Sequence, residues 1–166
     1  MNSDDLKKLQ TPLKEKYRED PGSALITLKA KGKVGENISC KVDTGRALVE
    51  AGLHPATGGN GMLACSGDML LEALVACAGV TLAAVATAIA VEITEGTIHA
   101  EGDLDFRGTL GVSKEVSVGF RSIRLYFNLK TNATTQQMES LMKLTERYCV
   151  VYQTLTKGVG VEIFYS

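Results

Sequence analysis

Residues Ala73–Val91 read ALVACAGVTLAAVATAIAV, a stretch that contains no charge and a single cysteine, Cys77. Roughly 18 or more apolar residues are enough for a membrane-spanning helix, but Ala, Thr and Gly dominate this stretch and contribute little transfer free energy. Glu72 comes directly before it, and no second stretch of this kind is present. We therefore expect no membrane span, but a helix that is apolar on every side and that protein must cover all round.

The composition is that of a single globular domain. The chain has 166 residues, of which 45% are hydrophobic and 22% charged, which is close to the average of such domains. Its 18 Lys and Arg residues stand against 19 Asp and Glu residues, a formal net charge of -1, and no dense basic cluster is present. Nucleic acid is therefore not an expected partner, because binding to a phosphate backbone needs such a cluster.

The N-terminal segment 1–22, MNSDDLKKLQTPLKEKYREDPG, is charged throughout. A secretory signal has an apolar core before a small-residue cleavage site, and this segment has none. We expect a cytoplasmic protein in which 1–22 is an N-terminal amphipathic extension and 23–166 is a single domain. Apolar residues recur at helical spacing within the extension, and Pro12 is expected to interrupt or restart that helix.

Alternating apolar residues predict strands ahead of the central helix. Two strands are expected at 24–32 and 37–44, with a turn at 33–36 between them. A long loop rich in Gly and small residues is expected at 46–68. It leads into the central helix, whose first turn contains Asp68, where a carboxylate can cap free N–H groups.

The same alternation returns after the central helix. The stretches 96–108 and 120–131 predict a pair of half-buried antiparallel strands, and VGVEIFY at 159–165 predicts a last strand. Together with the helices, this order indicates an α+β fold. Because the central helix carries many small residues and the chain is short, we expect an intertwined homodimer that buries both copies of the helix between sheets.

A second helix precedes the last predicted strand. Thr134 and Gln137 form a capping-box pattern at its start, and apolar residues including Cys149 follow at helical spacing. The β-branched pair Val150-Val151 predicts a break or distortion just after Cys149.

The cysteines at positions 40, 65, 77 and 149 contain no Cys-x-x-Cys pair. They fit neither a dense disulfide framework nor a zinc ribbon, and Cys65, Cys77 and His54 have no standard metal-ligand spacing. We therefore expect free thiols and no metal or bound cofactor. The helical periodicity alone predicts that Cys77 and Cys149 are small buried hydrophobic residues. A thiol in such apolar surroundings is inert unless a positive charge lowers its pKa.

Two segments in this order, CSGDMLLEALVACAGVTL at 65–82 and ERYCVVYQTL at 146–155, resemble the two cysteine motifs of the OsmC/Ohr family. These are the osmotically inducible protein C and organic hydroperoxide resistance proteins. The resemblance covers most of the chain after about Asp20. It implies an OsmC-like fold, with antiparallel sheets around a buried central helix, and an intertwined homodimer with active sites at the subunit interface.

The resemblance also implies roles for individual residues. Cys77 takes the position of the peroxidatic cysteine and Cys149 that of the resolving cysteine. Asp68 stands where many members have a glutamate that holds an arginine against the reactive thiol. The place that aligns with that arginine, near Lys33, offers no Arg, so Arg46 is our substitute, on the chemical ground that Cys77 needs a cation. Val150 stands where a proline commonly follows the second cysteine.

The function expected from these residues is thiol-dependent reduction of organic hydroperoxides by a cytoplasmic homodimer that uses an external thiol or dithiol reductant. One thiolate becomes a sulfenic acid and the other thiol converts it to a disulfide. The alternatives are a non-catalytic dimer of the same fold that binds a small apolar ligand, and acyl transfer on Cys77 with His54 as the base.

Overall fold

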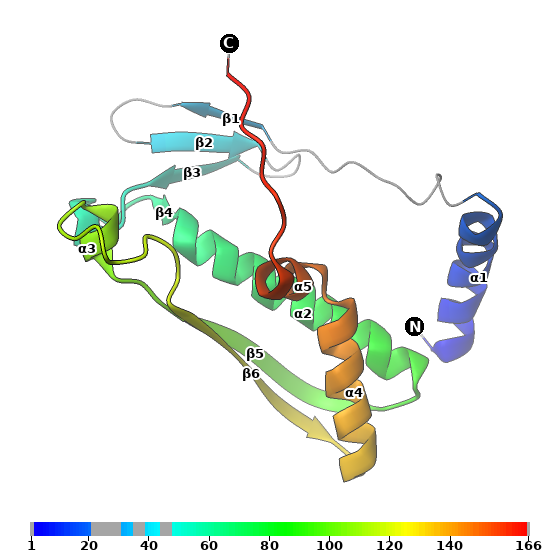
Figure 1. Ribbon diagram of the computed structural model, residues 1–166. Coiled ribbons are helices and arrows are strands. Elements are labelled where there is room, and N and C mark those ends of the chain that lie inside the picture. The colour runs from blue at the N-terminus through cyan, green and yellow to red at the C-terminus, as the bar shows by residue number, and fades with distance from the viewer. Residues whose placement is uncertain (1, 21–30, 35–38, 44–47, 166) are drawn as a thin grey trace. The chain divides into compact units, whose positions relative to one another are not determined.

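The computed structural model describes residues 2–20, 31–34, 39–43 and 48–165 (Figure 1). The chain forms two compact units. One comprises Met1–Ala24, Ala73–His99 and Tyr126–Ser166, and the other Leu25–Glu72 and Ala100–Leu125. The elements are α1 (Ser3–Glu19), β1 (Lys31–Val34), β2 (Ser39–Asp43), β3 (Leu48–Gly52), η2 (Pro55–Thr57), β4 (Ala64–Cys65), α2 (Ser66–Ala88), β5 (Ile93–Asp103), α3 (Phe106–Thr109), β6 (Ser122–Thr131), α4 (Thr135–Tyr148) and α5 (Val150–Lys157).

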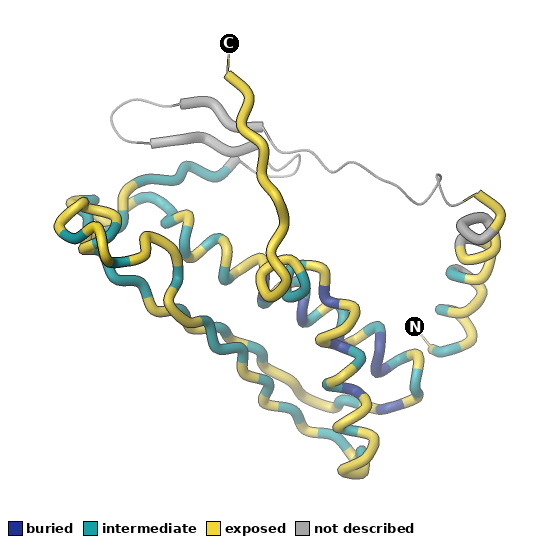
Figure 2. Tube along the Cα trace, viewed as in Figure 1, coloured by how far each residue is buried: buried dark blue, intermediate teal, exposed yellow. Residues whose placement is uncertain are grey.

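The core of the first unit lies between α2 and α4, where the buried residues gather in Figure 2. Leu82 and Val85 of α2 pack in one cluster with Leu141 of α4, which is completely buried. Half-buried side chains of β5 and β6, such as Ile98 and Leu129, pack against this cluster. Burying a side chain of this size contributes about 1.5–3 kcal/mol to the stability of the fold. These contacts fix one side of α2 in the core.

The opposite side of α2 is less covered within the chain. Val80 is 73% exposed, although the sequence predicts that the helix is covered all round. By length and composition α2 could cross a membrane, but the core helix of a globular protein passes the same test. One side of α2, with Leu82 and Val85, packs into the core of the first unit.

The C-terminus of α2 is closed by a left-handed residue. Ala90 has φ of 55°, and the N–H of Val91 donates to the carbonyl of Ala86 at 2.9 Å. This is the pattern in which a left-handed residue ends a helix and returns the chain, a position that glycine usually takes. The turn leads directly into β5.

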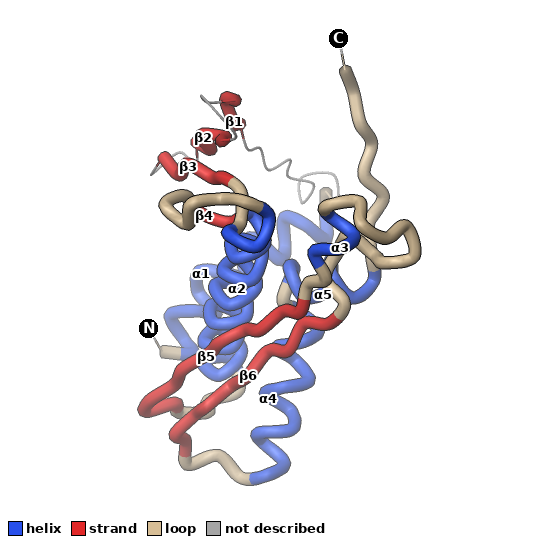
Figure 3. Tube along the Cα trace, turned by 90° about the vertical axis from the view of Figure 1, so that its left-hand side faces the viewer, coloured by secondary structure: helices blue, strands red, loops and turns tan. Residues whose placement is uncertain are grey.

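Strands β5 and β6 form a two-stranded sheet, seen side by side in Figure 3. The hydroxyl of Thr94 donates to the carbonyl of Lys130, and the N–H of Arg121 donates to that of Asp103, so the strands run antiparallel as predicted. The strand expected at 96–108 is wrong at its end. Asp105 accepts the N–H of Arg107 and starts the short helix α3 there, because a local side-chain cap competes with the strand pattern.

The second unit contains a four-stranded sheet in the order β1-β2-β3-β4. β1, β2 and β3 pair antiparallel, whereas β4 is parallel to β3. β2 lies within the second predicted strand. Two expectations are wrong here: β1 continues through Lys33 and Val34, where a turn was expected, and β3 lies inside the predicted loop 46–68. Both segments are strands because they pair with β2. Their small and charged residues give no strand signal in the sequence, so this pairing was not predicted.

Helix α1 also differs from expectation, because it continues through Pro12. Proline removes one hydrogen bond of a helix interior, and the remaining turns of α1 carry the helix across it. α1 lies within the predicted extension 1–22.

The capping box at the start of α4 is confirmed. The Thr134 hydroxyl accepts the N–H of Gln137 at 3.3 Å, and the Gln137 side chain accepts the N–H of Thr134 at 2.8 Å. Thr134→Ala leaves the first of these donors without its partner, so we expect the free energy of unfolding to fall by about 1 kcal/mol. Urea unfolding measures this loss, and Glu139→Ala, an exposed change in the second turn of α4, should stay within about 0.5 kcal/mol.

The predicted last strand is wrong. Residues 159–165 form no strand, and their apolar side chains lie in solvent, with Val161 at 82%, Ile163 at 85% and Phe164 at 87% exposure. Alternation shows that a segment can pair, but a strand needs a partner edge to supply its hydrogen bonds. Within the described part of a single chain, this segment has no such edge.

Candidate thiol site

The structure brings Cys77 and Cys149 together within the first unit. Cys77 lies half-buried in the middle of α2, and Cys149 is buried at 1% exposure between α4 and α5. The Cys149 thiol hydrogen-bonds to the Cys77 sulfur. The sequence order alone does not require this approach, so the pairing of these two thiols is the main finding at the site.

The break at Cys149 determines which groups face the sulfurs. Cys149 has an extended backbone, with φ of -73° and ψ of 107°, and it is both the last cap of α4 and the first cap of α5. The break therefore falls at Cys149 itself, next to the β-branched pair from which it was predicted. A new helix begins there, and the first N–H groups of a helix have no carbonyl partner within it.

Those N–H groups point to the two sulfurs. The N–H groups of Val150 and Val151 lie toward Cys77, and those of Val151 and Tyr152 lie beside the Cys149 sulfur without forming a regular capping hydrogen bond. Thr81, one turn after Cys77 on α2, also hydrogen-bonds to the Cys77 sulfur.

These contacts favour the ionised form of Cys77. Burial by itself raises the pKa of a thiol, but the N–H groups of Val151 and Val150, the Cys149 thiol and the Thr81 hydroxyl outweigh it, and the pKa of Cys77 lies below its usual value. Hydrogen bonds to a charged sulfur are stronger than those to a neutral thiol. The site therefore favours a thiolate at Cys77.

Cys149 responds in the opposite direction. Burial raises its pKa, and the neighbouring Cys77 sulfur raises it further, because a second negative charge next to the first is unfavourable. Cys77 therefore ionises first, and Cys149 stays a neutral thiol that donates to it. The pair therefore combines a thiol that ionises more easily with a neighbour that stays protonated, and thiol–disulfide exchange can use such a pair.

The other predicted site residues are not part of the first unit as described. Asp68, at the start of α2, lines a cavity of about 320 Å³ in the second unit together with His54 and Cys65. The His54 ring stacks on Phe106, with ring centroids 4.9 Å apart, and its Nδ1 accepts the N–H of Ala56. Arg46 lies outside the described residues. Among those that are described, no three His, Cys, Asp or Glu side chains form a metal-binding group.

The sequence reasoning missed the groups that contact Cys77. Thr81 is four residues after Cys77, a spacing that places both on one helix face, so this neighbour was available from the sequence. The N–H groups of Val150 and Val151 followed from the predicted break after Cys149, because a helix that restarts leaves donors free. The source of positive charge predicted from the sequence was a cationic side chain, and the backbone donors were not predicted.

Solved structures resemble this fold at low sequence identity. An OsmC-like protein from Mycoplasma pneumoniae matches with a TM-score of 0.67 and 16% identity, covering 81% of this chain and 89% of that one. An organic hydroperoxide resistance protein from Elizabethkingia anophelis matches with 0.63 and 21%, covering 81% and 90%. The organic hydroperoxide resistance protein OhrB of Bacillus subtilis matches with 0.52 and 20%, covering 80% and 92%.

These identities show a shared fold and no more. No curated protein sequence matches the chain. The family model described as OsmC-like protein matches residues 59–164, a range that holds α2, both cysteine motifs and the β5–β6 pair. Because this match covers well over half of the sequence, the chain belongs to the OsmC-like protein family.

Proposed function

We propose that this protein reduces organic hydroperoxides with Cys77 as the peroxidatic thiol and Cys149 as the resolving thiol. The observation that carries the proposal is the contact between the two sulfurs, together with the groups that lower the pKa of Cys77 alone. Family members with names such as organic hydroperoxide resistance protein support this choice of substrate. The apolar surroundings of Cys77 on α2 favour an alkyl peroxide over hydrogen peroxide.

The reaction balances with the two thiols and one peroxide. The Cys77 thiolate attacks one oxygen of the peroxide, so an S–O bond forms and the O–O bond breaks. Cys77 becomes a sulfenic acid, and the alkoxide takes a proton and leaves as an alcohol. The Cys149 thiol then attacks the sulfenic sulfur, releasing water and forming a Cys77–Cys149 disulfide. An external thiol or dithiol reduces that disulfide by exchange.

Asp68 and Arg46 belong to this proposal as supporting residues. Asp68 is exposed in the first turn of α2, where a carboxylate suits the positive end of the helix. In the proposed enzyme it orients Arg46 toward the thiol. Replacing Arg46 by Met removes that charge and leaves the backbone donors of α5 in place. The variant therefore separates the effect of Arg46 on the pKa of Cys77 from the effect of the α5 N–H groups.

The proposed active form is a cytoplasmic homodimer. The exposed side of α2 at Val80 and the exposed apolar segment 159–165 both require a cover that a second copy supplies. A large exposed apolar surface is typical of a protein–protein interface. A reducing compartment would keep the cysteines as free thiols between turnovers.

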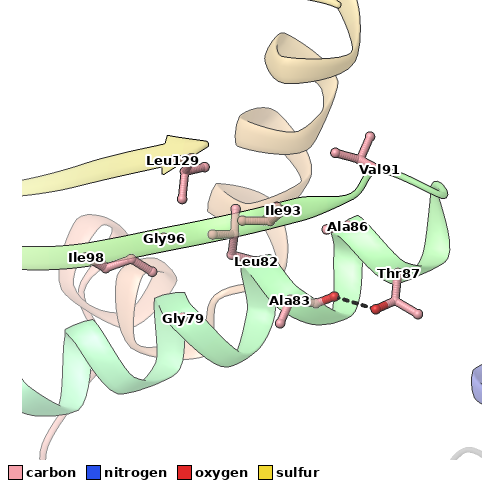
Figure 4. A pocket seen from close by; sticks show the side chains of 10 residues that line it. All are labelled: Gly79, Leu82, Ala83, Ala86, Thr87, Val91, Ile93, Gly96, Ile98 and Leu129. Atoms are coloured by element: carbon pink, nitrogen blue, oxygen red, sulfur yellow. Dashed lines mark hydrogen bonds between the residues drawn. The ribbon is translucent and has the colours of Figure 1, made fainter. Parts of the chain in front are cut away.

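A second candidate function is binding of a small apolar ligand without catalysis. A cavity of about 410 Å³ lies between α2 and the β5–β6 pair, and Leu82, Ile98 and Leu129 are among its lining (Figure 4). Its only polar side chain, Thr87, donates its hydroxyl to the carbonyl of Ala83 at 2.8 Å. The cavity is therefore suited to an alkyl chain. This function predicts thiols that resist alkylation in the native protein.

Mass spectrometry of the reduced protein after one equivalent of cumene hydroperoxide tests the peroxidase. We expect rapid formation of a Cys77–Cys149 disulfide, at a rate at least about 10-fold above that with hydrogen peroxide, a difference of about 1.4 kcal/mol in apolar contact. Peptide mapping identifies the bridge, and Cys65→Ser serves as the control that should leave it unchanged. If both thiols stay free while circular dichroism shows an intact fold, the peroxidase proposal is wrong.

A further inference from the structure

The cavity of about 320 Å³ lies wholly within the second unit. Two groups that the thiol pair does not use, the Cys65 thiol and the His54 imidazole, are part of its lining. Ligand pockets combine apolar walls with a few convergent polar groups and have volumes of about 300–1,000 Å³. This cavity therefore has the character of a site for a small ligand. Its apolar walls are the side chains of Leu71, Leu104, Phe106 and Phe120.

The Cys65 sulfur lies against the open space beside Gly67. A Cβ atom built on Gly67 would lie 3.6 Å from that sulfur, 3.5 Å from Cζ of Phe120 and 3.6 Å from Cδ1 of Leu104. The thiol therefore shares this space with an aromatic ring and an aliphatic side chain, and the glycine leaves the space open. Cys65 is half-buried, so a small molecule can reach the sulfur from solvent.

The His54 ring is held with one nitrogen available to a ligand. Its Nδ1 accepts the N–H of Ala56 at 3.0 Å, and the ring stacks on Phe106. The His54 carbonyl accepts both the N–H and the hydroxyl of Thr57, which fixes the backbone that carries the ring. An imidazole that accepts at Nδ1 carries its proton on Nε2. Within the part of the chain that the structure describes, nothing accepts a hydrogen bond from this Nε2–H.

The charges of the cavity favour an uncharged ligand. Its described lining contains the carboxylates of Asp68 and Asp103 and no Lys or Arg. Asp103 is paired with Arg124 and accepts the hydroxyl of Ser122 at 2.6 Å. A carboxylate ligand would find no cation for its charge, whereas a carbonyl oxygen can accept the hydrogen bond of His54. An apolar carbonyl compound therefore fits this lining.

We propose that this cavity binds a small, uncharged α,β-unsaturated carbonyl compound and that Cys65 captures it as a thioether. The carbonyl oxygen accepts the hydrogen bond of His54 Nε2, and the apolar part of the ligand lies against Phe120 and Leu104. The site uses neither Cys77 nor Cys149, so it stands or fails independently of the peroxidase.

The capture step balances without an oxidant or a reductant. The Cys65 thiol gives its proton to water, and its sulfur attacks the β-carbon of the ligand. An S–C bond forms, the π bond of the alkene breaks, and its electron pair moves through the α-carbon to the carbonyl oxygen. The hydrogen bond of His54 stabilises the enolate that results. Water then protonates the α-carbon, which restores the carbonyl group.

Labelling of Cys65 by trans-cinnamaldehyde, mapped by peptide mass spectrometry without peroxide, tests the site. We expect the rate to saturate with reagent concentration, because a complex forms before the S–C bond. Gly67→Ala places a methyl group in contact with the sulfur, so the rate should fall at least about 10-fold through loss of the reactive geometry. Gly119→Ala is the matched control, since a Cβ there meets nothing within 4 Å. A rate that rises linearly and is the same in Gly67→Ala overturns the proposal.

His54→Phe tests the hydrogen-bond donor separately. Phenylalanine keeps a ring to stack on Phe106 and has no N–H. We expect labelling of Cys65 by cinnamaldehyde to slow at least about 10-fold, while labelling by iodoethane, which has no carbonyl, stays within about twofold of that in the unmodified protein. An equal loss with both reagents would show that His54 only shapes the cavity and would overturn its role as donor.

Protection of the unmodified protein decides the matter where these variants do not fold. Acetophenone has a ring and a carbonyl but no alkene, so it should bind without reacting and slow the labelling of Cys65 by iodoethane. Ethylbenzene, which has the ring without the carbonyl, should protect less. Labelling that acetophenone leaves unchanged overturns the proposal.

Discussion

Cys77→Ser is expected to lower the rate of cumene hydroperoxide reduction by at least about 1,000-fold, because loss of the nucleophile removes the covalent step. A serine hydroxyl in the same place keeps the hydrogen bonds but does not ionise at neutral pH, so no attacking anion forms. Steady-state consumption of the peroxide, with dithiothreitol as the reductant, measures the loss. The rate of the unmodified protein should also fall as the pH drops through the pKa of Cys77, because protonation of the thiolate removes the nucleophile.

Cys149→Ser is the matched control for this result. It leaves the Cys77 nucleophile in place, so one equivalent of peroxide should still react, and a sulfenic acid on Cys77 should accumulate and be trapped by dimedone. Turnover should stop after that event unless an external thiol resolves it. Full turnover by Cys77→Ser would show that the nucleophile is a different thiol. So would a dimedone adduct on Cys65 in place of Cys77.

The helices could be predicted from the sequence because their signals are local. The uncharged stretch from Ala73 defines most of α2, and the pair Thr134 and Gln137 defines the start of α4. Capping side chains and helical spacing act within a few residues. The break at Cys149 could also be predicted from a local signal, the β-branched residues that follow it.

The sheet was harder to predict because pairing is not local. β3 is the sequence LVEAG, which carries a charge and two small residues and does not alternate, yet it pairs along its whole length with β2. Residues 159–165 alternate clearly and form no strand in the single chain. In both cases the deciding information is the neighbouring edge, which a sequence window does not contain.

The site was predicted in part for a similar reason. The resemblance gave Cys77 and Cys149, and the structure places them together. The expected source of positive charge was a side chain, because a sequence lists side-chain types and does not show where backbone N–H groups point. The donors that the structure aims at Cys77 are main-chain groups of Val150 and Val151, which any residue except proline would supply. The sequence records only that residue 150 is not a proline.

Replacing Val161 and Ile163 by Ser together is expected to weaken dimerisation by at least about 10,000-fold. The two side chains are 82% and 85% exposed in the single chain, and covering each contributes about 1.5–3 kcal/mol. A symmetric dimer covers two such tails, which gives at least about 6 kcal/mol in total.

Sedimentation equilibrium measures this loss, with the unmodified protein expected to be a dimer at micromolar concentration. Glu162→Ser is the matched control, because alternate residues of an extended segment point to opposite sides and residue 162 faces away from Val161 and Ile163. It should leave the dimer intact. The dimer would be rejected if the unmodified protein sedimented as a monomer. An unchanged dimer in the double variant would place the interface on α2, where Val80 lies exposed, and not on the C-terminal segment.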